Sequence, residues 1–529
     1  MKKQKILLTS LLTLGFLAMG CASDDKEKKE TTGAGAPLCN PTEVIEGFIS
    51  VNRTIGANSC VAIKGAVTVL QGATLRIEEG AKVLADTSTL SYIKVNRGAK
   101  IEAVGTASNP VIFTSGAAVG SRSPSDWGGI VIHGASATNQ TAGSNYAADT
   151  EIFTGPYGCG DSNFTCQGTP ALSNNDNSGE LRYVRVEFAG REIASGKEFN
   201  GIFLAGVGKG TKIEYVQVHR GSDDGIEIFG GAVDIRYAII TNNQDDQFDV
   251  DEGWRGIAQY VVAAVPKDGD QAIEYDGIGA DRSRASNTIM SNFTMLGSLN
   301  KTIPGAISIR ASGTARIYNS YIAHFWGANG IIAVANESVC LAKDGNMVHP
   351  GPTPAETDDH CNGDPVTPNP GFVGSGSGAD AFVLRFESNF IECAFTDAMF
   401  SNPRSDLNAL FARGNQPQGA LPSKFNDNRT ASASHPVSDV GRFPDSSGNG
   451  DNVYTGSCNS PKLSRPGENI LWGVTNGVAE FIPAANITVS NFADPQAAPN
   501  GTDLPQPTYI GAFAAGDTWA NGWTAFPVN

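Results

Sequence analysis

The sequence is 529 residues long, has a formal net charge of −16 and contains 62 glycines, whereas only 17% of its residues are charged. The negative charge excludes nucleic acid as an expected partner and opposes direct adhesion to anionic lipid, but it suits cations and neutral or basic partners. A chain so rich in glycine and so poor in charge is typical of β-structure with many turns, and its length permits a large core.

The first 20 residues have the pattern of a secretion signal. Three lysines among the first five residues precede an apolar run from 6 to 19. This run is shorter than the about 20 apolar residues of a transmembrane helix and fits the core of a signal peptide. The ending Leu17-Ala18-Met19-Gly20-Cys21 resembles the lipobox of bacterial lipoproteins. The resemblance implies that Cys21 is acylated and that residues 1–20 are removed; the alternative is an ordinary signal peptide with an incidental cysteine.

Residues 21–38 are expected to form a flexible tether, because they are small or charged and cannot bury a core. The run Ser23-Asp24-Asp25 resembles a surface-export signal of some bacterial lipoproteins, and Ala22 resembles the residue found in lipoproteins sorted to the outer membrane. We therefore expect a chain that is lipid-anchored at the outer membrane or the cell surface of a diderm bacterium.

Eight cysteines follow Cys21, and an even number in an exported chain predicts disulfides. The pairing cannot be deduced, but the local choices are 39–60, 159–166 and 340–361, which leave 393–458. Two of these would close excursions at 140–178 and 338–378. A zinc site is disfavoured, because the chain has no Cys-x-x-Cys motif and its six histidines are scattered. The eight are Cys39, Cys60, Cys159, Cys166, Cys340, Cys361, Cys393 and Cys458.

Short strands recur at one spacing in the middle of the chain. The segment Asp223-Asp224-Gly225-Ile226 aligns with Asp245-Asp246-Gln247-Phe248, 22 residues later, and weaker copies surround them at 129–132, 201–204, 272–276, 306–310 and 331–334. A repeat of this length with short strands and no helix predicts a right-handed parallel β-helix. Alternate residues such as Ile226 and Ile228 should then point into one continuous aliphatic core.

Further segments carry a family resemblance: 72–83, 98–101, 109–114, 126–129 and the ending 509–513. They resemble the pectate-lyase-like β-helix superfamily and, more closely, a group of uncharacterised bacterial surface β-helix lipoproteins. The resemblance implies an all-β fold, a right-handed parallel β-helix with loop excursions and terminal caps. It implies no single activity, because the superfamily includes lyases, hydrolases, adhesins and structural proteins.

One β-helix domain is expected over 39–529. The segment between Cys39 and Cys60 should cap its N-terminal end. The stretch 338–378 should project as an inserted loop, and 400–465 should wrap irregularly around the outside. Residues 508–529 should cap the last coil, because an open β-helix end exposes unpaired strand edges.

Stacking the aligned coils predicts two outward columns on one sheet. The first contains Phe203, Glu227, Asp249, Glu274 and Ser308, and the second contains Phe229, Asp251, Asp276 and Arg310. Neighbouring coils lie about 4.8 Å apart, and two charges about 5 Å apart repel by roughly 3 kcal/mol at an effective dielectric constant near 20. A bound Ca²⁺, raised pKa values or a basic neighbour such as Arg310 should relieve this repulsion.

Three interpretations of this acidic face compete. In the first, it is a solvated surface whose turn aspartates accept backbone N–H groups. In the second, it binds Ca²⁺, the only cofactor expected, together with a glycan that Glu227 contacts and on which Trp254 stacks. The candidate Ca²⁺ ligands are Asp223, Asp224, Asp245, Asp246, Asp249 and Asp251.

In the third interpretation the face is catalytic. Glycosidases need two carboxyl groups about 5 Å apart for retention or about 6.5–9.5 Å apart for inversion. The candidates are Asp249, Asp251, Glu274 and Asp276, with Arg310 as the base of a Ca²⁺-dependent lyase. The run Gln244-Asp245-Asp246 resembles the Asp-Asp coil of polygalacturonases, but their downstream Gly-His-Gly and Arg-x-Lys motifs are missing.

We therefore expect a non-catalytic module on the cell surface that binds polysaccharide or another envelope ligand. Its partners would be the membrane, through the lipid on Cys21, and a polysaccharide, but no nucleic acid. The alternatives are a polysaccharide lyase or glycoside hydrolase acting on acidic glycans, and a structural adhesin.

Overall fold

The computed structural model describes residues 35–140, 146–147, 149–150, 152, 154–166, 176–277, 286–298, 305–311, 313–325, 332–334, 385–393, 400–401, 441–443, 452–455, 461–463, 471–488, 492 and 504–529. The described part contains 31 strands and one short 3₁₀ helix, η4 (Gly477–Phe481). The expected signal peptide, Cys21, the tether up to residue 34 and the expected loop 338–378 lie outside the described residues.

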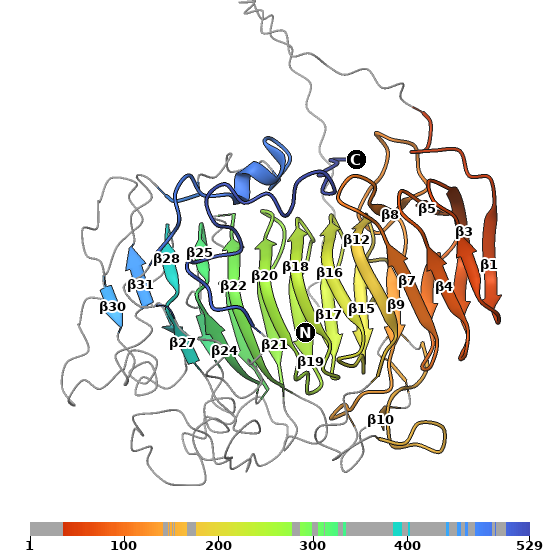
Figure 1. Ribbon diagram of the computed structural model, residues 1–529, viewed down its shortest axis with the longest axis horizontal. Helices are drawn as coiled ribbons and strands as arrows, with labels where there is room; N and C mark the ends of the chain where they lie inside the picture. Colours follow the sequence, from red (N-terminus) through yellow and green to blue (C-terminus); the bar gives the residue numbers. More distant parts are fainter. Residues whose placement is uncertain are drawn as a thin grey trace, which may run out of the picture. The chain divides into compact units, whose positions relative to one another are not determined.

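The fold is a right-handed parallel β-helix, as the 22-residue repeat predicted (Figure 1). Among the described residues, 27 strands belong to one hydrogen-bonded system in which each coil pairs with the next, and the pairs are parallel except for β30 (Gly441–Phe443) with β31 (Asn452–Thr455). The first coils consist of β1 (Val44–Ile49), β2 (Arg53–Ile55), β3 (Cys60–Val69), β4 (Thr74–Ile77), β5 (Lys82–Ala85), β7 (Lys100–Val104) and β8 (Val111–Ser115).

Two walls of the β-helix matter for function. The first, which we call the ladder wall, consists of β6 (Tyr92–Val95), β9 (Ile130–His133), β15 (Ile202–Ala205), β17 (Ile226–Phe229), β19 (Phe248–Asp251), β21 (Ile273–Asp276), β23 (Ile307–Arg310), β26 (Ile332–Val334) and β29 (Phe400–Ser401). The second, the strap wall, consists of β12 (Gly179–Glu187), β16 (Lys212–His219), β18 (Asp234–Thr241), β20 (Ile257–Ala264), β22 (Asn287–Leu296), β24 (Thr314–Tyr318), β25 (Tyr321–Ala323), β27 (Arg385–Glu387), β28 (Phe390–Glu392) and β31.

The core is a stack of apolar side chains at equivalent positions of successive coils. On the ladder wall, Ile202 pairs with Ile226, Ile226 with Phe248, and Phe248 with Ile273. All four side chains are buried in the same cluster, as the alternation along each strand predicted. Each such side chain contributes about 1.5–3 kcal/mol on burial, so the column holds the coils together without help from helices.

The strap wall bends at a left-handed residue that recurs in each coil. Tyr183, Tyr215, Tyr237 and Tyr260 have φ between 52° and 59°, a region that is strained for a residue with a side chain. Their rings stack with centroid distances of 4.6, 4.6 and 5.1 Å. The stacking offsets the strain and aligns the corner from coil to coil.

The C-terminal residues do not cap the last coil, so the prediction for 508–529 is wrong. Residues 471–488 and 504–529, which we call the strap, lie along the strap wall instead and run back toward the first coils (Figure 1). Asn292 Nδ2 donates to Tyr509 O at 2.9 Å, Gln217 Nε2 to Ala525 O at 2.7 Å, and Arg122 Nη2 to Asn529 O at 2.9 Å. The strap runs there because the buried amides of this wall need partners.

Two other boundaries differ from the expectation. The segment Cys39–Cys60 is disulfide-bonded, but it contributes β1, which pairs in parallel with β3, and so it forms the first coil rather than a lid. Phe48 at this end is 77% exposed. Strands β29 and β31 belong to the coils, so the expectation that all of 400–465 wraps around the outside is wrong.

Part of the excursion 140–178 folds onto the ladder wall. Its Ala147, Ile152 and Tyr157 are buried against Phe203 and Phe229. The excursion includes β10 (Tyr146–Ala147), which pairs with β11 (Tyr157–Gly158); a second hairpin nearby consists of β13 (Glu192–Ala194) and β14 (Lys197–Glu198). The excursion therefore covers the part of the ladder wall that contains Phe203 and Phe229.

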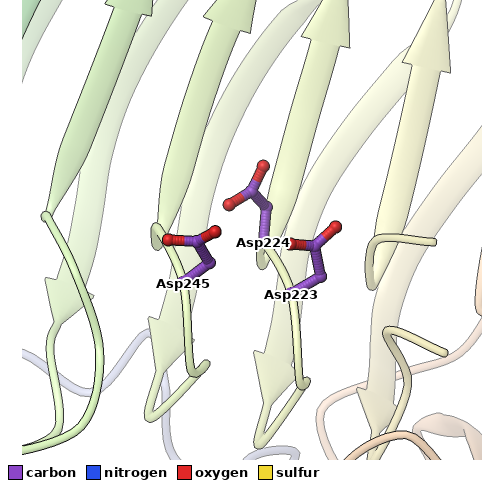
Figure 2. Close-up of side chains that lie close together, drawn as sticks. All are labelled: Asp223, Asp224 and Asp245. Atoms are coloured by element: carbon purple, nitrogen blue, oxygen red, sulfur yellow. The ribbon is translucent and has the colours of Figure 1, made fainter. Parts of the chain in front are cut away.

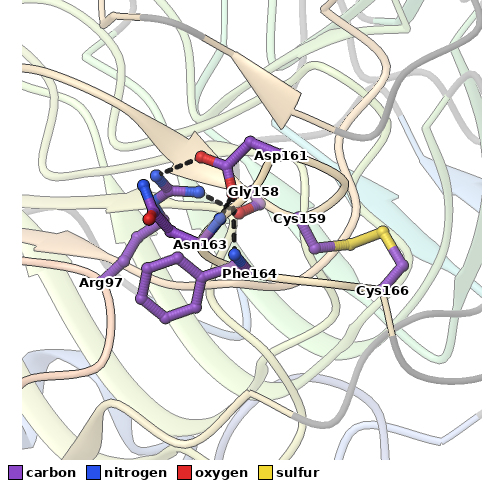
Figure 3. Close-up of a disulfide and its surroundings, with 7 residues drawn as sticks. All are labelled: Arg97, Gly158, Cys159, Asp161, Asn163, Phe164 and Cys166. Atoms are coloured by element: carbon purple, nitrogen blue, oxygen red, sulfur yellow. Dashed lines mark hydrogen bonds and ion pairs between the residues drawn. A yellow bond between two sulfur atoms is a disulfide. The ribbon is translucent and has the colours of Figure 1, made fainter.

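The excursion is fastened by a disulfide and an arginine (Figure 3). Cys159 and Cys166 form a disulfide, as the local pairing predicted. Arg97 donates to Gly158 O at 3.0 Å and to Asp161 Oδ2 at 2.7 Å, and its guanidinium lies 4.4 Å from the ring centroid of Phe164. Cys393 is also disulfide-bonded, whereas Cys340, Cys361 and Cys458 lie outside the described residues.

Candidate functional site

The pairing of the ladder-wall strands confirms the register of the outward columns. Glu227 pairs with Asp249, Asp249 with Glu274, and Glu274 with Ser308. In the second column Phe229 pairs with Asp251, and Asp276 with Arg310. We call the acidic residues of the two columns and of the turns before them the carboxylate ladder. It exists because the alternation along each strand directs the same positions outward in every coil.

The turn aspartates form hydrogen bonds from coil to coil. Asp224 Oδ1 accepts the backbone N–H of Asp246 at 2.9 Å, and Asp246 Oδ1 accepts that of Gln271 at 2.6 Å. This is the behaviour expected of a solvated face whose aspartates satisfy backbone groups. However, Asp224 and Asp246 are only 7% and 3% exposed, so water cannot screen their charges and the simple interpretation is incomplete.

Three groups of ladder residues have the geometry of a metal site. They are Asp223, Asp224 and Asp245; Asp224, Glu227 and Asp249; and Asp245, Asp246 and Asp270. Within each group one carboxylate oxygen per residue lies within 4.8 Å of the others. Figure 2 shows the first group, in which Asp223 and Asp224 on one turn approach Asp245 on the next. The three groups overlap, and together they contain five of the six residues that we predicted as Ca²⁺ ligands. Asp251 belongs to none of the three groups.

The ladder has a closed half and an open half. Asp224, Glu227 and Asp246 make up the closed half and are less than 10% exposed. Asp249, Asp251, Glu274 and Asp276 are partly buried and, with the exposed Arg310, make up the open half. The excursion lies next to the closed half, because its buried side chains cover Phe203 and Phe229, which continue the columns beyond Glu227 and Asp251.

Burial and mutual repulsion raise the pKa values of the ladder. Burial raises the pKa of Asp224, Asp246, Asp249 and Asp251 well above the ordinary value, and neighbouring carboxylates raise them further. Burial also raises the pKa of Glu274 to about 7, although Arg310 opposes the shift. These carboxylates therefore hold a proton more readily than solvated ones do, and a bound cation would oppose that tendency.

Arg310 is bound to two carboxylates, which corrects its expected role as a base. It donates to both oxygens of Asp276, with Nε–Oδ1 at 2.9 Å and Nη2–Oδ2 at 3.0 Å, and Nη2 lies 2.7 Å from Glu274 Oε2. Hydrogen bonds and charges from these carboxylates raise the pKa of Arg310 although burial opposes the shift. A guanidinium held in this way keeps its proton, and it serves to neutralise the open half.

Trp254 does not belong to the site, and the prediction that it stacks on a sugar is wrong. Its side chain is 0% exposed within the aliphatic core, and its Nε1 donates to Val233 O at 3.0 Å. The turn after β19 directs the indole inward, where it packs beside Phe248 with a centroid distance of 5.9 Å.

Two residues of the site had not been predicted. Asn200 precedes β15, is 0% exposed, and donates from Nδ2 to Glu227 Oε2. Tyr157 of the excursion donates its hydroxyl to Glu252 Oε2. Asn200 carries a signal in the sequence, since Ile202 aligns with Ile226 and so places Asn200 one coil before Asp224. Tyr157 carries none, because an excursion has no repeat.

A family model described as a pectate-lyase-like beta helix domain matches residues 47–348, which is more than half of the chain. The chain belongs to the pectate-lyase-like β-helix family. No curated protein and no solved structure matches it. In this member of the family the matched region contains every residue of the carboxylate ladder and the described part of the excursion above it. Among the described residues, no helix is both long and apolar enough to cross a bilayer.

Proposed function

We propose that this pectate-lyase-like β-helix protein is a non-catalytic module, lipid-anchored through Cys21 on the bacterial surface, that binds a polysaccharide on the open half of its carboxylate ladder. The observation that carries the proposal is the register of Asp249, Glu274 and Asp276 on neighbouring coils. Partly exposed carboxylates on a rigid sheet accept hydrogen bonds from sugar hydroxyls, and their spacing repeats along the wall as hydroxyls repeat along a glycan.

The charge of the site favours a neutral glycan. Glu274 and Asp276 outnumber the one arginine that they bind, so the open half stays negative beside Arg310. A uronate chain would be repelled unless a cation bridged it, whereas neutral hydroxyls find acceptors that are already positioned. The disulfides Cys39–Cys60 and Cys159–Cys166 support an exported protein, because such bonds persist in oxidising compartments.

The test is binding of the full chain to a panel of neutral and acidic polysaccharides, measured by affinity electrophoresis and calorimetry. We expect Asp276→Asn combined with Glu274→Gln to weaken binding by about tenfold or more, since a hydrogen bond to a charged group contributes about 1.5–3 kcal/mol. Glu214→Gln is the matched control, because Glu214 is a partly exposed carboxylate on β16 of the strap wall. No binding to any polymer, or equal binding by the double variant, would refute the proposal.

The anchor is tested separately. In the native host the Cys21→Ser variant should move from the membrane fraction to the soluble fraction, because it can no longer be acylated. Retention of the variant on membranes would show that the lipid does not hold the chain.

A second candidate function is a glycoside hydrolase or polysaccharide lyase. One observation favours it: burial raises the pKa of Glu274 to about 7, and Glu274 and Asp276 lie close enough that Arg310 contacts both. Such a pair suits acid–base catalysis, which contributes about 10²–10⁴-fold to a rate. The release of reducing or unsaturated ends from a polysaccharide, abolished by Glu274→Gln, would establish it; without turnover of any polymer the candidate fails.

A further inference from the structure

Where the closed half of the ladder meets the open half, at Asp249, three carboxylates form a pocket of oxygen atoms with the dimensions of one metal ion. Asp224, Glu227 and Asp249 each place one carboxylate oxygen within 4.8 Å of the others. Calcium binds oxygen at about 2.3–2.6 Å, so ligands on opposite sides of one ion lie about 4.8 Å apart. Three carboxylates at this separation are therefore as close as the ligands of a shared ion.

A fourth oxygen belongs to the amide that contacts Glu227, and it has no hydrogen-bond partner. Asn200 is completely buried, its Nδ2 donates to Glu227 Oε2, and its Oδ1 accepts no hydrogen bond. The next two coils use the equivalent oxygen, of Asp224 and of Asp246, to accept a backbone N–H. Asn200 departs from this pattern, and a buried amide oxygen without a partner is unfavourable unless something else coordinates it.

We propose that Asn200, Asp224, Glu227 and Asp249 bind one divalent cation of the Ca²⁺ class. The ion would connect three successive coils, those of β15, β17 and β19. An all-oxygen set of one neutral and three charged ligands suits Ca²⁺, whereas Zn²⁺ prefers nitrogen and sulfur, and Mg²⁺ retains several waters that a closed site excludes.

This site meets the polysaccharide face only at Asp249, and its other three ligands lie outside that face. Glu227, Asp224 and Asn200 are each less than 10% exposed, so a glycan cannot reach the ion through them. The ion stabilises the coils by removing the repulsion between the three carboxylates. The ion also gives the buried Oδ1 of Asn200 a partner. The polysaccharide test alters Glu274 and Asp276, which are not ligands of the ion, so the two proposals can fail independently.

The experiment measures Ca²⁺ binding to the full chain after chelator treatment and dialysis. Calorimetry with Ca²⁺ alone should give one site per chain. Asn200→Leu and Glu227→Gln should each weaken binding by about tenfold or more, since even groups that only orient metal ligands contribute about 10–100-fold to affinity. Asn200→Asp keeps an oxygen at the position and should retain binding. The matched control is Asp276→Asn in the open half.

The proposal is overturned if the native chain shows no Ca²⁺ binding by calorimetry or by equilibrium dialysis. It is equally overturned if Asp276→Asn removes the site while Glu227→Gln keeps it, or if Asn200→Leu binds as the native chain does. If Asn200→Leu does not fold, as judged by circular dichroism, Glu227→Gln and Asn200→Asp decide the outcome. Equal Ca²⁺ affinity of Glu227→Gln and the native chain would then reject the site.

Discussion

The two walls of this β-helix stack polar residues in the same way but satisfy them differently. On the strap wall neutral amides are covered by backbone groups of the strap: Gln217 exchanges two hydrogen bonds with Ala525, and Asn242 does so with Trp472. On the ladder wall the stacked side chains are carboxylates, whose neighbours raise their pKa values. A peptide segment can satisfy an amide column, whereas an acid column requires protons, a cation or a ligand.

His219 illustrates the neutral character of the strap wall. Its Nε2 donates to Pro527 O at 3.1 Å, and burial lowers the pKa of His219 to about 3. The imidazole therefore stays uncharged at neutral pH and can be covered without a counter-ion. The four predictions below test this contrast, from the largest expected effect to the smallest.

The largest effect should come from the residue that anchors the strap. Trp472 is 1% exposed and packs in the apolar cluster that the strap forms with the strap wall. We expect Trp472→Ala to lower the free energy of unfolding by about 3–5 kcal/mol, the usual cost of such a truncation in a core. Thr475→Ala, an exposed position on the same segment, is the control. Urea denaturation measures both; an unchanged midpoint would mean that the strap adds nothing to stability.

The next prediction concerns the cover of the ladder wall. The hydroxyl of Tyr157 donates to the buried carboxylate of Glu252. We expect Tyr157→Phe to cost about 1.5–3 kcal/mol, because a hydrogen bond to a charged group is lost while the ring remains. Tyr92→Phe should change stability by less than about 0.5 kcal/mol, since Tyr92 is only partly buried. Thermal melts of the two variants compare them, and equal melting temperatures would show that the excursion is not held at this point.

On the strap wall the corner tyrosines should contribute less. Tyr237 stacks on Tyr215 at 4.6 Å and on Tyr260 at 5.1 Å. Replacing it in Tyr237→Leu removes two ring contacts, for which we expect a loss of about 1–2 kcal/mol. Tyr237→Phe keeps the ring and serves as the control. If both variants unfold at the same denaturant concentration, stacking is not what offsets the strain at φ 56°.

The smallest effect should appear as a pH dependence of the protein in chelator. The pKa of Glu274 is raised from 4.5 to about 7, so between these values the folded chain binds a proton that the unfolded chain has lost. Stability from this group is therefore present at low pH and declines as the pH rises through 7. We expect this group to contribute a loss of about 1 kcal/mol between pH 6.5 and 8.5, so the loss should be smaller in Glu274→Gln than in the native chain. A native profile that is flat over this range would contradict the raised pKa.

Two buried histidines oppose this trend below pH 6.5. Burial lowers the pKa of both His133 and His219 from 6.5 to about 3. The unfolded chain then binds protons that the folded chain excludes, so stability falls as the pH drops below 6.5.

The repeat predicted which residues of successive coils lie next to one another along the β-helix. Once Asp224 was aligned with Asp246, the register of Glu227, Asp249 and Glu274 followed, because strand pairing preserves it. The same alignment also pairs Asp276 with Arg310, so their ion pair could have been predicted from the sequence.

What covers each wall was not predictable in this way. Gln217 and Ala525 are 308 residues apart, and no spacing in the sequence relates them. The prediction for Trp254 was wrong because an aromatic residue that follows an acidic run can have either an exposed or a buried side chain. Only the conformation of the turn at Glu252, with φ 53°, and the bond to Val233 O decide that the indole points inward.

The strap also changes how the molecule should respond to mechanical force. In a solenoid each coil contacts only its neighbours, so pulling on one end detaches the coils one after another. The strap joins Asn292, Gln217 and Arg122, and therefore coils that are far apart along the axis. A pulling force applied at Gly35 should detach β1 to β7 in small steps. The coils that the strap joins should then unfold together in one step. Under shear, this one segment would let the first coils detach while it holds the central coils together.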